Sequence, residues 1–137
     1  MGVLMAKEKV AECFQPGDHA STFGGNPLAS AAGCAAMSIL ADQAFLAETT
    51  KKGKYFETQL NKLQSKYGFL TDVRGKGLIL GLGITIEGKQ IVDACTAKGL
   101  LINCVGSNVL RFLPPLIVSK ENIDTAVAII DEAMSNL

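Results

Sequence analysis

The spacing of apolar residues changes several times along the first part of the chain, and each change predicts a new element. Residues 1–6, MGVLMA, form an unbroken apolar run, which predicts a short buried strand. Residues 7–14 place apolar side chains at helical spacing and predict a short helix, which Pro16 and the glycine after it bring to an end. Residues 17–25 have no periodicity and are predicted to form a loop.

Two helices are predicted next. Asn26 is a favourable N-cap and Pro27 suits the first helical position, so a helix should begin there and run through LASAAGCAAMSIL. After Asp42 apolar residues recur between Lys, Glu and Gln, as on an amphipathic helix that covers a sheet. This second helix should end at Gly68.

The remaining sequence alternates between strand and helix patterns and predicts an α/β fold. One strand is expected over 73–86 and a helix over 89–98, which Gly99 ends. Residues 100–105 and 109–113 read as two strands joined by a tight turn, and therefore as a hairpin.

The last helix is predicted from residue 120, with Ser119 as its cap and Glu121 near its positive end. Its inward face should carry four apolar residues at helical spacing, namely Ile123, Val127, Ile130 and Met134.

The composition excludes several functions for this chain of 137 residues. Thirteen Lys and Arg balance thirteen Asp and Glu, so no basic stripe suggests nucleic acid. No apolar run reaches membrane length and no secretory leader is visible, which favours a cytoplasmic protein. The chain has four cysteines without a CxxC pair and one histidine, so we expect reduced core thiols and no metal site.

The stretch GDHASTFGGNPLASAAG contains the first candidate site. Ser21 and Thr22 precede Gly24-Gly25 and a helix start, and a glycine-rich turn before a helix offers N–H donors to an anion such as phosphate. The spacing of a Walker loop is absent. The alternative is an ordinary helix cap preceded by a flexible turn.

Arg111 in VLRFLPP is the second candidate. It lies mid-strand among apolar residues, where an unpaired guanidinium would be unfavourable, so it needs an anionic partner. Its planar fork suits a substrate carboxylate, and a structural ion pair to an Asp or Glu is an equally good explanation.

Three further basic residues are more simply structural. Arg74 and Lys76 alternate with glycines, which is typical of a strand entry where backbones pack closely. His19 has no partner spaced for a catalytic triad and is expected to be a hydrogen-bonding loop residue.

Taken together, four blocks resemble the C-terminal part of class III, ornithine-type aminotransferases. They are GDHASTFGGNPLASAAG, VRGKGLILGL, KGLLINCVGSNVLRFLPPL and SKENIDTAVAIIDEAM, in family order over essentially the whole chain. The resemblance implies the type I fold of enzymes that depend on pyridoxal 5'-phosphate. Residues 1–42 would be the tail of the large cofactor domain, and 43–137 a small C-terminal α+β domain with a mostly antiparallel sheet covered by helices.

The resemblance also implies roles for three residues in a homodimer. Thr22 would reach the cofactor phosphate of the other subunit, Ser21 would lie at the substrate end, and Arg111 would hold the α-carboxylate of the amino acid. The motif STFGGNPLA is most similar to that of family members that transfer the δ-amino group of N-acetylornithine to 2-oxoglutarate in arginine synthesis. Ornithine- and 4-aminobutyrate-type activities are alternatives.

The chain departs from the family in length and in catalytic residues. The Schiff-base lysine, the aspartate at the pyridinium nitrogen and the stacking aromatic have no match, and Lys7 and Lys9 follow the first strand rather than precede it. We therefore assign no catalytic residue and expect the chain alone to be inactive. A non-catalytic dimerisation domain is the alternative of another class.

Overall fold

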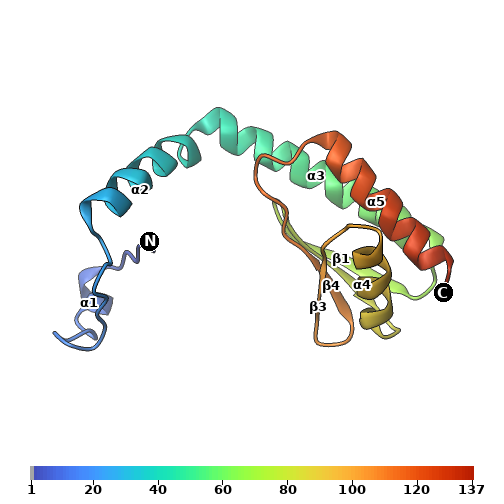
Figure 1. Cartoon of the computed structure of the whole chain (residues 1–137), viewed down its shortest axis with the longest axis horizontal. Coiled ribbons are helices and arrows are strands. Elements are labelled where there is room, and N and C mark those ends of the chain that lie inside the picture. Colours follow the sequence, from blue (N-terminus) through green and yellow to red (C-terminus); the bar gives the residue numbers. More distant parts are fainter. Residues whose placement is uncertain (1) are drawn as a thin grey trace. The chain divides into compact units, whose positions relative to one another are not determined.

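The computed structural model describes residues 2–137, which divide into two compact units, Met1–Phe45 and Leu46–Leu137 (Figure 1). Helix α3, Gln43–Lys66, starts in the first unit and lies mostly in the second. The assignment of the first part of the chain to a cofactor domain and the rest to a small domain remains a prediction.

The first unit contains two helices, α1 at Glu8–Ala11 and α2 at Pro27–Leu40. Helix α2 begins as predicted: the Asn26 side chain accepts a hydrogen bond of 3.0 Å from the Ala29 amide. No described residue of this unit is buried. The apolar side chains of α2 include the exposed Leu28 and Met37.

The strand predicted over residues 1–6 is wrong where the structure describes it. Residues 2–6 are irregular and exposed, while Met1 lies outside the described residues. A strand requires a hydrogen-bonded neighbour, and no described strand pairs with this run. An apolar pattern alone therefore overpredicted this element.

The second unit is built on one antiparallel sheet of four strands in the order β1-β2-β4-β3. Three helices, α3 to α5, pack against one face of the sheet (Figure 1). This confirms the predicted α/β class and the mostly antiparallel sheet. The elements after α3 are β1 Leu70–Lys76, β2 Ile79–Ile84, α4 Gly88–Ala97, β3 Asn103–Val105, β4 Val109–Phe112 and α5 Lys120–Ser135.

The single strand predicted over 73–86 is wrong, because the chain turns in its middle to form the β1–β2 hairpin. Gly77 has φ +58° at this turn, a conformation that glycine adopts without strain. Gly53 of α3 lies directly against the backbone of Gly77, and a Cβ at position 53 would be only 2.6 Å from the Gly77 carbonyl carbon. Glycine at 53 thus allows the helix to lie on the turn.

The core lies between the covered face of the sheet and the three helices. Its fully buried side chains include Leu60, Leu82, Leu110 and Ile130. The inward face predicted for α5 is confirmed, since Ile123, Ile130 and Met134 are buried and Val127 packs against them. The β3–β4 hairpin and the Ser119 cap, which accepts from Asn122 N at 3.1 Å, are also as predicted.

The cysteines differ from the prediction of four core thiols. All are free, but Cys95 alone is buried, whereas Cys104 is half-buried and Cys13 and Cys34 are exposed. Among residues 2–137, no single helix is both long and apolar enough to cross a membrane, and only α2 together with α3 meets those criteria as a bent pair.

Candidate functional site

The loop before α2 is held in shape by short-range hydrogen bonds. Ser21 Oγ accepts from the Gly24 amide at 3.1 Å, and the Asn26 side chain donates to the Phe23 carbonyl at 2.7 Å. Gly25 has φ +69°, so the chain bends here in a way that favours glycine. The glycines therefore make a tight turn that leads into a capped helix.

The two hydroxyls of the loop differ in their surroundings. Ser21 is engaged with Gly24 and, together with His19, lines an open hollow against residues 2–4. Thr22 is exposed, and no described residue forms a hydrogen bond with its hydroxyl. A free hydroxyl on a glycine turn before a helix fits a phosphate oxygen, which accepts hydrogen bonds. The residues present thus suit the phosphate of pyridoxal phosphate.

Arg111 lies at the centre of β4, and its surroundings correct the sequence argument. It is exposed on the sheet face opposite the helices, while its neighbours Leu110 and Phe112 point into the core. The desolvation penalty that we expected at this position therefore does not apply. No ion pair with Arg111 occurs within residues 2–137, so the structural ion pair is not found there.

The exposed sheet face also carries Arg74, which was expected to be structural, and Asn103, which the sequence did not single out. Register pairs Arg111 with Gly81 on one side and with Asn103 on the other, and Gly81 pairs in turn with Arg74. These four residues form one row across the sheet. The available signal was Gly77, where a turn divides this run into two paired strands and places Arg74 beside Gly81.

Arg74 has an acidic partner on its own strand. Its Nη1 donates to Oδ2 of Asp72, while Thr71 Oγ1 donates to Oδ1 of the same carboxylate at 2.9 Å. The Arg74 guanidinium, helped by Thr71, holds the pKa of Asp72 below its usual range. Arg74 is therefore charge-paired, whereas Arg111 remains free.

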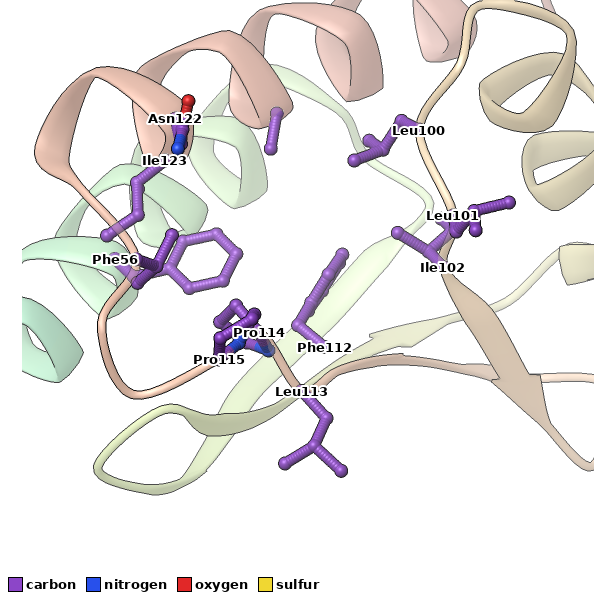
Figure 2. A pocket seen from close by; sticks show the side chains of 12 residues that line it. Phe56, Leu100, Leu101, Ile102, Phe112, Leu113, Pro114, Pro115, Asn122 and Ile123 are labelled. Atoms are coloured by element: carbon purple, nitrogen blue, oxygen red, sulfur yellow. The ribbon is translucent and has the colours of Figure 1, made fainter. Parts of the chain in front are cut away.

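An apolar cleft of about 250 Å³ lies on the helix side of the sheet (Figure 2). The rings of Phe56 and Phe112 meet edge to face across it with centroids 5.4 Å apart, and Pro114 and Pro115 close one wall. Asn122 is its one polar side chain. Without an ionisable group, this cleft offers no acid–base chemistry, so the chemically useful groups are those on the opposite face and in the loop.

A metal site is not favoured by the arrangement of ligands. Within the part of the chain that the structure describes, no three His, Cys, Asp or Glu residues gather in a way that could hold an ion. The candidate chemistry is therefore that of anion binding, with a hydroxyl at Thr22 and a guanidinium at Arg111.

A small antiparallel domain, a glycine turn before a small-residue helix and a strand arginine are the features that the resemblance to a transaminase segment implied. The family model of class-III aminotransferases matches residues 1–134. The chain belongs to this family.

Relatives of known name cover the whole chain. It is 50% identical over 138 residues to acetylornithine aminotransferase from Caldanaerobacter subterraneus subsp. tengcongensis, and 42% identical over 137 residues to that from Methanocaldococcus jannaschii. Each alignment includes all of this chain. It covers only 35% of the first relative and 34% of the second. The chain thus spans about a third of their length.

Solved structures agree in fold. The crystal structure of acetylornithine aminotransferase from Elizabethkingia anophelis matches with a TM-score of 0.80 at 32% identity, over 97% of this chain and 36% of that one. Ornithine aminotransferase from Plasmodium yoelii matches with a TM-score of 0.81 at 28% identity, over 96% of this chain and 36% of that one. The fold expected from the resemblance is confirmed.

Proposed function

We propose that the complete protein to which this chain contributes is an acetylornithine aminotransferase. It transfers the δ-amino group of N-acetylornithine to 2-oxoglutarate, as a step in arginine biosynthesis. The observation that carries the proposal is the 50% identity to a relative of that name over every residue of the chain. The chain covers about a third of such relatives, so most of the reaction centre belongs to the rest of the protein.

Pyridoxal phosphate would supply the carbonyl chemistry that takes up and returns the amino group. Thr22 would donate a hydrogen bond from its free hydroxyl to the cofactor phosphate, and the turn at Gly24 would bring this hydroxyl close to it. Ser21, which already shapes the turn, would lie beside the substrate. In a homodimer these groups would serve the site of the other subunit.

Arg111 would hold the substrate α-carboxylate through two parallel N–H···O bonds. Its support is the free guanidinium on a rigid central strand, which has both neighbouring strands to hold it. Such a group is pre-organised, because the backbone at Arg111 does not have to move to bind. Substrate binding is therefore the role that its geometry favours.

The exposed apolar side chains of the first unit support an assembled protein. Phe23, Leu28 and Met37 are 80%, 82% and 59% exposed. A monomer rarely leaves so much apolar surface in water, so we propose that this unit packs on the remainder of the enzyme and its homodimer partner. The reaction would take place in the cytoplasm.

The activity is tested with the complete enzyme and a panel of amino donors in the presence of 2-oxoglutarate. N-acetylornithine should give the highest kcat/KM, well above ornithine and 4-aminobutyrate. A preference for ornithine would contradict the proposed donor and favour the ornithine-type alternative. Absence of transamination with every donor would favour the non-catalytic alternative.

The role of Thr22 is tested separately by cofactor affinity. Thr22→Val should raise the dissociation constant for pyridoxal phosphate by about tenfold, because one hydrogen bond to a charged group is lost. Thr96→Val, at an exposed helical position, is the matched control and should leave the affinity unchanged. Equal affinities of the Thr22→Val variant and the wild type would contradict the assignment.

A further inference from the structure

Both arginines of the chain lie in one row on the uncovered face of the sheet. Arg74 pairs across strands with Gly81, and Gly81 pairs with Arg111. Paired residues of antiparallel strands point to the same face, so the two guanidinium groups share this surface. The aliphatic part of Arg74 lies over Gly81, since a Cβ there would be 3.8 Å from Arg74 Cγ.

Asp72 brings a carboxylate to the same surface. Its side chain, together with that of Thr71, occupies the space over Gly83 that a Cβ at position 83 would need. Gly83 pairs with Val109. Arg111 lies two residues further along β4 and is therefore the diagonal neighbour of Gly83. Diagonal neighbours on an antiparallel sheet are about 7–8 Å apart, within reach of a long side chain. Asp72 is therefore a possible partner for either arginine.

The structure resolves this competition in favour of Arg74. Asp72 accepts from Arg74 Nη1, and Arg111 forms no ion pair with any residue between 2 and 137. Thr71 also donates to Asp72 and holds its carboxylate over Gly83. The outcome is one neutralised and one free guanidinium on the same face.

We infer that Arg74 is a positioning residue that keeps Asp72 away from Arg111, so that Arg111 stays available for a substrate carboxylate. The inference rests on the proposed role of Arg111. Without the Arg74 charge, Asp72 would turn to Arg111, which is the remaining guanidinium on this face. A substrate carboxylate would then have to displace an internal one.

The internal exchange is tested by NMR on the 137-residue chain. Since it has two arginines, the side-chain Nε–Hε spectrum contains two arginine signals. Arg74→Gln should shift the Arg111 signal as the new pair with Asp72 forms, and adding Asp72→Asn should return the signal to its original position. The inference would be overturned if the Arg111 signal did not shift in Arg74→Gln, or if it did not return to its original position in the double variant.

The consequence for substrate is tested in the complete enzyme. Arg74→Gln should raise the KM for 2-oxoglutarate about fivefold, the effect of one competing exposed ion pair. The double variant Asp72→Asn with Arg74→Gln should return the KM to within about twofold of wild type, and Arg74→Lys, which keeps the charge, should remain near it.

Asp72→Asn alone separates positioning from support of the fold. It breaks the same Asp72–Arg74 pair but leaves no anion to compete, so the KM should not rise. A raised KM in both single variants, without recovery in the double variant, would mean that the pair only supports the fold and would refute the inference. If Arg111→Gln left the KM unchanged, the proposed function of Arg111 would fail, whereas the NMR exchange would still decide the inference.

Discussion

For the substitution Gly53→Ala, helix propensity and tertiary packing predict opposite changes in stability. At an ordinary helical position, Gly→Ala stabilises by about 1 kcal/mol, because alanine restricts the unfolded backbone. At position 53 the new methyl group would be 2.6 Å from the carbonyl carbon and 2.8 Å from the Cα of Gly77. Carbon atoms at their best separation are roughly 3.5–4.0 Å apart, so helix or turn would have to move by about 1 Å.

The expected result is a net loss of stability. Overpacking of this kind costs about 1–3 kcal/mol, and here both partners are backbone, which cannot rotate away. Because neither backbone can rotate away, we expect the upper part of this range, about 2–3 kcal/mol, so after the helix gain of about 1 kcal/mol is subtracted Gly53→Ala should lower the free energy of unfolding by about 1–2 kcal/mol. For a unit of this size, the melting temperature should fall by roughly 10 °C.

The measurement is urea and thermal unfolding followed by far-UV circular dichroism. Exposed Glu57, one turn further along α3, supplies the control: Glu57→Ala should be about 1 kcal/mol more stable than Glu57→Gly. A Gly53→Ala variant that matches or exceeds the wild type would refute the close approach of α3 to the β1–β2 turn.

Three further predictions concern stability. Asp131 accepts from Lys66 Nζ at 2.7 Å and from the Tyr67 hydroxyl at 2.6 Å, which hold its pKa below the usual range; Asp131→Asn should therefore cost about 1 kcal/mol at pH 7. The ionised Asp131 stabilises the fold above the ordinary carboxyl pKa of about 4, and this stabilisation is lost as the pH falls below that value. The difference in free energy of unfolding between wild type and Asp131→Asn, measured by urea titration, should therefore shrink from pH 5 to pH 2. A difference that stays constant with pH would contradict this prediction. Leu110→Ala should lower the free energy of unfolding by about 2–5 kcal/mol in the same titration, because Leu110 is fully buried, and a loss below 1 kcal/mol would mean that the core is misplaced. Asn26→Ala should lower hydrogen-exchange protection at the start of α2 by about 1 kcal/mol, and unchanged protection would rule out the cap.

Local signals predicted the helices of this protein well. The caps Asn26 and Ser119 depend on one side chain and the amide three residues later, so short sequence windows contain all of their information. The glycine after α4 behaves likewise, since Gly99 has φ +81° as expected of a helix end. These elements required no knowledge of tertiary contacts.

Features that depend on distant contacts were harder to predict. An apolar run over 73–86 fits one long strand as well as two paired ones, and only the glycine at 77 distinguishes them. Arg111 was taken to lie in an apolar environment because the pattern does not tell which face of a two-sided sheet is covered. The Asp72–Arg74 pair was missed for the same reason. That this pair lies on the same face as Arg111 follows only from the register of β2 with β4.

The central claim, that Arg111 is the carboxylate anchor of this chain, is tested most directly by the KM for 2-oxoglutarate in the complete enzyme with Arg111→Lys. Lysine keeps the charge but loses the bidentate fork, so the KM should rise about tenfold or more. Lys76→Gln removes an exposed charge from the same hairpin and should leave the KM unchanged. A KM for Arg111→Lys equal to that of the wild type would contradict the account.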